Sequence, residues 1–187
     1  RFKEAESVLR KSLEIYDRLP TDHFGRIKSL TLLAQVLDDQ DKFAEAERLD
    51  REALELSRKF DSDESVGVCL NNLGITLLKQ HRIAEAEKFV REANQIARKQ
   101  DNDETIAKAA NSLGALLHMR GRLAEAEVLY RSALKTDPTQ MRAVVRLADV
   151  LSREKKTQEL AALADAPIAG SALPPETLMQ IAGALRD

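Results

Sequence analysis

The chain has 187 residues, of which 43% are hydrophobic, 32% are charged and 4% are aromatic, and its formal net charge is −2. The slightly negative net charge does not favour binding to nucleic acid or to an anionic membrane. No apolar run approaches the ~20 residues of a membrane span. The single cysteine, Cys69, excludes an intrachain disulfide and fits a reducing compartment, so we expect a cytoplasmic protein.

The first predicted helix spans residues 2–18, where apolar side chains recur at three- and four-residue steps. Three pairs of helices with short turns are then expected, at 25–40 with 43–59, 64–80 with 83–99, and 104–120 with 123–136. The last part of the chain predicts a helix at 139–154, a shorter one at 157–165, a loop at 166–171 and a final helix from Pro174 to about Leu185.

These helices follow an internal repeat. Short Ala-Glu-Ala-Glu or similar segments place their first glutamates at 4, 45, 85 and 125, so the spacings are 41, 40 and 40 residues. Self-similarity at a fixed period of this size is typical of repeat arrays. Each period holds a first-type helix with a Leu-small residue pair and a second-type helix that begins with the alanine segment.

Two glycines recur at one register of the first-type helices, Gly74 and Gly114. A glycine inside a helix costs about 1 kcal/mol relative to alanine, so its recurrence indicates a packing requirement. We expect Gly74 to face Ala86 and Gly114 to face Ala126, because antiparallel helices approach closely only where side chains are small.

The residues around these glycines resemble the tetratricopeptide repeat. The resemblance rests on Leu73-Gly74 with Ala86 and, more fully, on Leu113-Gly114 with Tyr130 and an ending at Pro138. The period of about 40 residues is similar to the longer-period subset found in kinesin light chains, against the common 34. The resemblance implies an all-α fold, a right-handed α-solenoid of stacked antiparallel helix pairs.

On this basis the whole chain, 1–187, is expected to be a single solenoid domain. Its parts are a half repeat at 2–22, repeats at 23–61, 62–101 and 102–138, a degenerate repeat at 139–166 and a capping helix at 174–187. Because Arg1 lies within a repeat and no methionine precedes it, we expect a piece of a longer protein.

Three positions depart from the family pattern: Ala34 replaces the glycine, Asp50 stands where an aromatic or aliphatic residue is usual, and Leu160 replaces the last alanine. A buried aspartate is costly unless it is paired. We therefore expect the helix at 43–59 to be rotated or locally exposed at Asp50.

No sequence motif for catalysis is present: there is no Walker loop, dinucleotide-binding glycine motif, His-Glu-x-x-His or Cys-x-x-Cys. We therefore expect no enzymatic activity, no cofactor and no metal. His23, His81 and His118 occupy different registers and are expected at the surface, and Cys69 is expected to pack as a small apolar residue.

The resemblance implies that the first-type helices line a concave groove, since stacked helix pairs curve. The candidate groove residues share a polar or cationic side chain: Asn71, Asn72, Lys79, Lys108, Asn111, Ser112, Arg142, Arg146 and Arg153. Asparagine has no propensity advantage in a helix, yet its amide can both donate to and accept from an extended peptide backbone.

Cations outnumber acids in the later part of this groove, where Asp149 is the one acid among five basic residues. We therefore expect a non-catalytic interaction scaffold whose partner is a peptide or protein segment with acidic side chains or a free carboxylate. The same pattern also fits cations that are solvated, paired with Asp149 and Glu154, or covered by the last helix. The alternative function is a regulatory or oligomerisation segment of a larger enzyme or receptor, with self-association through the N-terminal end.

Overall fold

The computed structural model of the chain describes residues 2–18, 22–60, 63–99, 103–165 and 175–184, and regular structure in these ranges is all helical. The helices are α1 (Phe2–Arg18), α2 (His23–Asp38), α3 (Phe43–Lys59), α4 (Asp63–Lys79), α5 (Ile83–Lys99), α6 (Asp103–Met119), α7 (Leu123–Thr136), α8 (Met141–Arg153), α9 (Thr157–Asp165) and α10 (Pro175–Ala184). The all-α fold of repeated helix pairs is confirmed. The loop predicted at 166–171 and Leu185 lie outside the described residues. Within the described part, no helix is long and apolar enough to cross a membrane.

The second-type helices α3, α5, α7 and α9 have the predicted bounds, whereas the first-type helices α2, α4 and α6 begin one or two residues earlier than predicted. The start of α2 has a local cause. A carboxylate oxygen of Asp22 accepts a hydrogen bond of 2.9 Å from the amide of Gly25, so it satisfies one of the free amides of the first turn and lets the helix begin at His23.

The turns inside the helix pairs repeat one geometry. Asp41, His81 and Gly121, each forty residues apart, have positive φ angles of 59°, 59° and 72°. The amide after each of them reaches back to a leucine carbonyl, as Lys42 does to Leu37 at 2.9 Å. This is the Schellman ending of a helix, and glycine at 121 adopts the left-handed conformation without strain.

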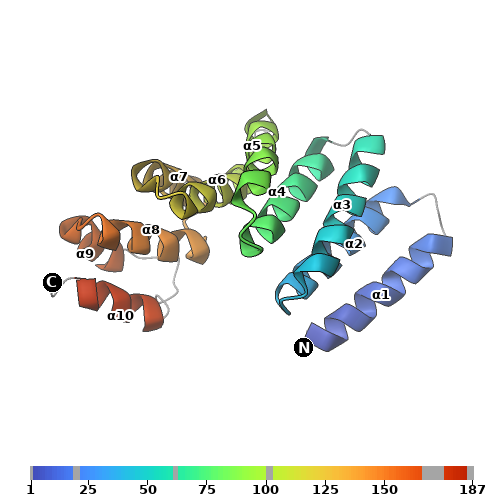
Figure 1. Cartoon of the computed structure of the whole chain (residues 1–187), viewed down its shortest axis with the longest axis horizontal. Helices are drawn as coiled ribbons and strands as arrows, with labels where there is room; N and C mark the ends of the chain where they lie inside the picture. Colours follow the sequence, from blue (N-terminus) through green and yellow to red (C-terminus); the bar gives the residue numbers. More distant parts are fainter. Residues whose placement is uncertain (1, 19–21, 61–62, 100–102, 166–174, 185–187) are drawn as a thin grey trace. The chain divides into compact units, whose positions relative to one another are not determined.

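Contacts divide the chain into two compact units, Arg1–Gln100 and Asp101–Asp187, which we call the N-terminal and C-terminal units. In the N-terminal unit, α1 to α5 pack in chain order, each against the next (Figure 1). In addition α2 packs closely against α4, whereas α1 and α3, and α3 and α5, meet through long side chains, as in the Arg10–Glu45 and Arg58–Glu92 ion pairs. The first-type helices α2 and α4 therefore lie on the inner side of this row.

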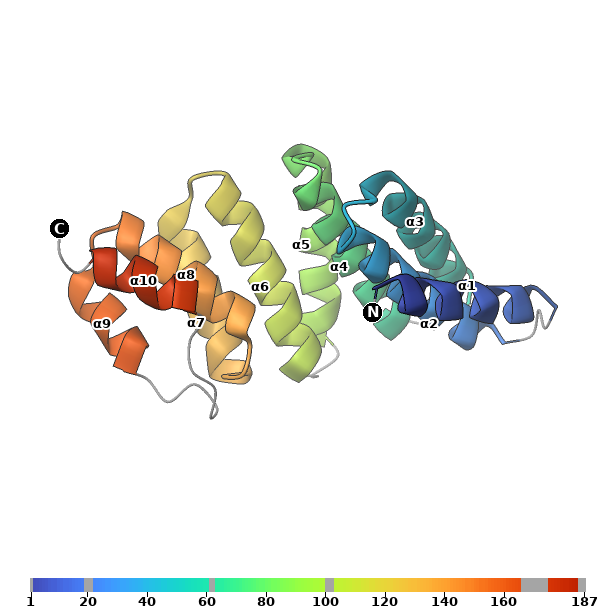
Figure 2. The same cartoon turned by 90° about the horizontal axis from the view of Figure 1, so that it is seen from below.

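The C-terminal unit repeats that arrangement with α6 to α9 in chain order and with α6 also in contact with α8. The last helix, α10, packs against both α8 and α9, as predicted, and Figure 2 shows it lying along α8. Its contact differs in detail from the predicted one. Ile181 is buried, but Leu178 is 43% exposed and Ala182 is exposed, so the apolar stripe is only partly covered.

The recurring glycines mark close helix contacts, but their predicted partners are wrong. A Cβ atom added at Gly74 would lie 2.5 Å from Cγ2 of Val90, and one added at Gly114 would lie 2.7 Å from Cε1 of Tyr130. The repeat alanines such as Ala86 are fully buried, but the glycines face the residue one turn further along the second-type helix. The glycines therefore make room for a large side chain.

Burial differs between α1 and α3, and it corrects the expectation for Asp50. No residue of α1 is buried and Phe2 is 52% exposed, because α2 is the main packing partner of α1 among the described helices. Asp50 is 1% exposed, and Ala46 and Ala53 on the same helix are fully buried. The helix α3 is therefore neither rotated nor locally open at Asp50. The buried carboxyl group of Asp50 instead has a hydrogen-bond partner on a neighbouring helix, Thr76 of α4.

Candidate functional site

The inner side of the N-terminal unit, formed by α2 and α4, combines apolar and polar side chains. We call this surface the N-terminal inner face. Leu32 and Val68 are 40% and 39% exposed, and Lys28 and Gln35 are exposed beside them in the sequence of α2.

Asn71 and Asn72, the two amides predicted to bind a peptide, stand on α4 of this face. Oδ1 of Asn71 and Nδ2 of Asn72 are buried and have no hydrogen-bond partner among the described residues. Asn72 is only 8% exposed, whereas Asn71 is half-buried and therefore more accessible. Unsatisfied amide groups cost free energy unless a water molecule or a ligand pairs with them.

Lys79, the third predicted groove residue of this unit, has carboxylate partners. Its ammonium nitrogen lies 3.6 Å from Oδ2 of Asp38 and 3.7 Å from Oδ1 of Asp39. Two acids therefore neutralise the one cation, and this end of the N-terminal inner face carries no surplus of positive charge.

The inner side of the C-terminal unit, formed by α6 and α8, is the C-terminal inner face. Its centre is Arg146, which is half-buried and donates from Nη1 to Oδ1 of Asn111 at 3.2 Å. Arg142 is exposed one turn earlier on α8. Burial is the main cause that lowers the pKa of Arg146, and the positive charge of Arg142 adds to it.

The other predicted residues of this face have partners within their own helices. Lys108 pairs with Glu104, and Arg153 Nε lies 3.0 Å from Oδ2 of Asp149. Ser112 is 3% exposed and donates to the backbone carbonyl of Lys108 at 3.1 Å. None of these three side chains supplies an unpaired charge to the C-terminal inner face.

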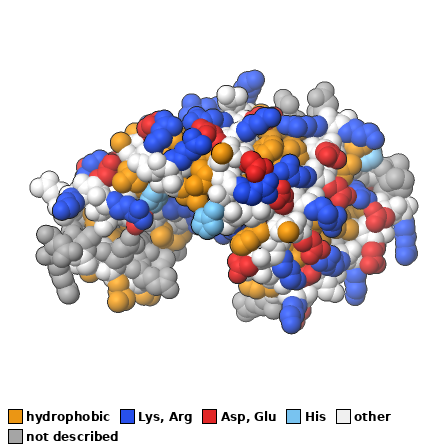
Figure 3. Space-filling model, viewed as in Figure 1, with side chains coloured by type: hydrophobic (Ala, Val, Ile, Leu, Met, Phe, Trp, Pro, Cys, Tyr) orange, Lys and Arg blue, Asp and Glu red, His pale blue; other side chains and the backbone are white. Residues whose placement is uncertain are grey.

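Arg142 and Arg146 are different, because neither has a carboxylate within ion-pair distance among the residues that the structure describes. Glu154, one of the acids considered as a partner for the groove cations, pairs with Lys156 at 2.9 Å instead. Elsewhere basic and acidic side chains are interspersed, as Figure 3 shows for one face of the molecule. Two guanidinium groups thus lie one turn apart on α8 without a described counter-ion.

The sequence did not predict the polar cluster behind these arginines. His118, expected at the surface, has a side chain only 15% exposed, and its Nε2 lies 2.9 Å from Oδ2 of Asp149. Its ring also meets that of Tyr130 edge to face, with centroids 6.4 Å apart. Burial lowers the pKa of His118 although the Asp149 carboxylate opposes this. The equivalent position one repeat earlier is Leu78, so the repeat pattern does not indicate a polar contact at His118.

Tyr130 is fully buried and its hydroxyl has no hydrogen-bond partner among the described residues. Burial raises the pKa of this hydroxyl, while the charge of Arg146 opposes the shift. The phenol therefore stays protonated and places an unused donor within electrostatic reach of Arg146.

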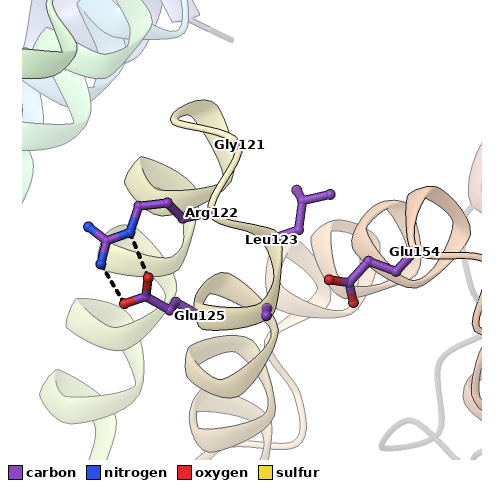
Figure 4. A pocket seen from close by; sticks show the side chains of 6 residues that line it. Gly121, Arg122, Leu123, Glu125 and Glu154 are labelled. Atoms are coloured by element: carbon purple, nitrogen blue, oxygen red, sulfur yellow. Dashed lines mark hydrogen bonds and ion pairs between the residues drawn. The ribbon is translucent and has the colours of Figure 1, made fainter.

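A shallow open pocket lies at the turn between α6 and α7 and is lined by Gly121, Arg122, Leu123, Ala124, Glu125 and Glu154 (Figure 4). Arg122 is bound to Glu125 through two hydrogen bonds of 2.6 Å each. The charges at this pocket are thus satisfied locally. Among the described residues, no three His, Cys, Asp or Glu side chains gather in a way that fits a metal ion.

The family profile described as tetratricopeptide repeat matches residues 1–59 and 66–139. No curated protein matches the sequence significantly.

Among solved structures, BtubC (BKLC) from P. vanneervenii is similar with a TM-score of 0.72 and 22% identity over 97% of this chain and 74% of that one. A Rap protein complexed with Competence and Sporulation Factor has a TM-score of 0.81 and 17% identity over 100% of this chain and 50% of that one. The Rap conjugation gene regulator of plasmid pLS20, in complex with the Phr* peptide, has a TM-score of 0.72 and 18% identity over 87% and 47%. The chain thus spans about half the length of the two Rap proteins, and at these identities the likeness shows the fold.

Proposed function

Because the chain belongs to the tetratricopeptide repeat family, we propose that it is a non-catalytic interaction scaffold and that its partner is a peptide or protein segment bound on an inner helix face. The family and the similar structures support a protein-interaction scaffold. The Phr* peptide in one of the Rap structures supports the choice of a peptide as the ligand class.

The observation that carries the acidic character of this partner is the unpaired arginine pair of α8. Arg146 is half-buried and uses one of its five N–H groups on Asn111, so the remaining donors lack an acceptor among the described residues. A carboxylate, from an acidic side chain or a free C-terminus, supplies both the charge and the two-oxygen geometry that a guanidinium prefers. Arg142 adds a second cation at the exposed edge.

On the N-terminal inner face the proposal assigns a different role to Asn71 and Asn72. Their unpartnered amide atoms match the donors and acceptors of an extended backbone. Leu32 and Val68 offer apolar contact area for side chains of a segment bound on this face. Because Asn71 is half-buried whereas Asn72 is 8% exposed, Asn71 is the better candidate for the first contact.

Replacing Arg142 by glutamate is expected to weaken the binding of a short fluorescein-labelled peptide that ends in Asp-Asp with a free carboxylate. We expect about a tenfold loss of affinity, or ~1.4 kcal/mol, and a weaker dependence on salt, because an attractive charge becomes repulsive. Fluorescence anisotropy at two salt concentrations measures both. The melting temperature should stay the same, since Arg142 is exposed and has no described ion pair to lose.

Arg98→Glu is the matched control, because Arg98 is an exposed arginine near the end of the second-type helix α5 and undergoes the same change of charge. It should bind the peptide as the unchanged chain does. Equal affinities of the Arg142 and Arg98 variants would contradict the proposal. So would a C-terminally amidated peptide with lysines in place of the aspartates that binds as tightly as the acidic one.

The alternative function, an oligomerisation or regulatory segment, is favoured by one observation. Val8 and Ile15 lie two turns apart on one side of α1 and are 65% and 56% exposed. If this side mediates self-association, the chain should show a concentration-dependent rise in mass by light scattering, and Val8→Asp should abolish it. A chain that stays monomeric at all concentrations would contradict the alternative function and leave the interaction scaffold as the proposed one.

A further inference from the structure

The hydroxyl group of Thr76 on α4 lies between two carboxyl groups. Its Oγ1 is 2.9 Å from Oδ2 of Asp38 on α2 and 2.8 Å from Oδ2 of Asp50 on α3. A hydroxyl group has one hydrogen, so it can donate to only one of these two oxygens. The other short contact is a hydrogen bond only when that carboxyl group is itself protonated and donates to Thr76.

The surroundings indicate which carboxyl group is protonated. Lys79 Nζ lies 3.6 Å from the same Oδ2 of Asp38, so Asp38 has a counter-ion. Asp50 has no cation within ion-pair distance among the described residues, and it is 1% exposed against 7% for Asp38. An ionised carboxylate without a partner is expensive to bury, whereas a neutral acid is not.

The helices packed against α3 add little positive charge. They are α2 and α4. The titratable groups that act on this cluster are Asp38 and Asp39 from α2, Glu47 from α3 itself, and Cys69 and Lys79 from α4. Burial raises the pKa of the Cys69 thiol to about 11, so it is neutral, and Lys79 is shared with Asp39 at 3.7 Å. Arg51 and Arg82, the cations nearest to Glu47, are paired with that carboxylate at 2.8 Å and 2.6 Å, so they are not counter-ions of Asp50.

We propose that Asp50 is a neutral acid in the folded chain and donates to Thr76, which donates to the ionised Asp38, so that one bound proton joins α3, α4 and α2. The proposal stands apart from peptide binding and needs no ligand. It implies that the N-terminal unit takes up a proton when it folds. Because α2 and α4 form the N-terminal inner face, the stability of that face then depends on pH.

The direction of the pH dependence follows from the two states of Asp50. Burial, the main cause, together with the nearby Asp38 and Glu47, raises the pKa of Asp50 to about 7, against the lowering effect of Thr76. An aspartate in the unfolded chain has a pKa of about 3.9. Between about pH 4 and pH 7 the folded chain therefore holds a proton that the unfolded chain has released, and its stability falls as the pH rises through that window.

The pKa can be measured directly in the full chain by ¹³C NMR of the aspartate side-chain carboxyl carbons between pH 3 and pH 9, with Asp50→Asn used to assign the resonance. The expected result is a midpoint near 7 for Asp50. A midpoint near 4 would overturn the proposal, whatever the variants do to stability.

Urea denaturation, followed by circular dichroism at pH 5 to pH 8, tests the link to folding. The folding equilibrium constant of the unchanged chain should fall by up to about tenfold per pH unit below pH 7 from this one group. Asp50→Asn keeps a donor for Thr76 and should remove that fall and exceed the unchanged chain in stability at pH 8. Asp39→Asn, at a neighbouring acid that is 47% exposed, should keep the fall. Parallel pH profiles for the unchanged chain and Asp50→Asn would overturn the proposal.

Discussion

Replacing Leu33 by alanine is expected to lower the free energy of unfolding by about 2–5 kcal/mol. Leu33 is 1% exposed on α2, the helix that packs against α1, α3 and α4. The change removes apolar contacts and leaves a cavity that surrounding helices fill only in part. Urea denaturation followed by circular dichroism at the helix band measures the loss.

Leu32→Ala is the matched control, because it deletes the same atoms from the adjacent residue of the same helix. Leu32 is 40% exposed on the N-terminal inner face, so its truncation should cost about 1 kcal/mol or less. Similar losses for the two variants would mean that α2 presents a different side to the core. If the proposed function is right, Leu32→Ala should instead affect binding.

Enlarging Ala126 to leucine is the second change for which we expect a large effect, a loss of about 1–3 kcal/mol in the free energy of unfolding. Ala126 is fully buried in α7, where this helix packs against α6 and α8. Tyr130, one turn later, already fills the space left by Gly114, so a leucine has little room to rotate into. Thermal and urea unfolding of the same sample measure the loss.

Ala124→Leu is the control for this prediction, since Ala124 lies two residues away on the exposed side of α7. The same three added carbon atoms meet solvent there, and the cost should stay within about 0.5 kcal/mol. A variant at 126 that unfolds no more readily than the variant at 124 would show that the α6–α7 contact is loose enough to accept a larger side chain.

Much of the fold could be predicted from the sequence because its determinants are local. Apolar residues at helical spacing specify which side of each helix is buried, and the forty-residue repeat gives the starts of α3, α5 and α7 at residues 43, 83 and 123. The departures at helix starts are also local, as at Asp22, whose side chain caps the first turn of α2. The candidate site was predictable only as a set of positions on the first-type helices, without the state of any charge.

The residues that face the two helix glycines depend on how the helices pack, which local sequence patterns do not determine. The recurrence of Gly74 and Gly114 indicated a packing requirement, but the contact is with Val90 and Tyr130 rather than with the nearest small residues. Two antiparallel helices can slide by one turn without changing either periodicity. Only the packed pair specifies which turn of α5 or α7 fills the space above each glycine.

By itself, the sequence determined the fold class, the helices and the family, because each depends on the repeating order of residue types along the chain. The tertiary structure decided which charges remain available. Lys79 meets Asp38 of another helix while Arg142 and Arg146 meet no described carboxylate, and Asp50 reaches Thr76 across 26 residues of sequence. Charge state depends on burial and on distances of a few ångströms between separate helices, and these distances exist only once the helices have packed.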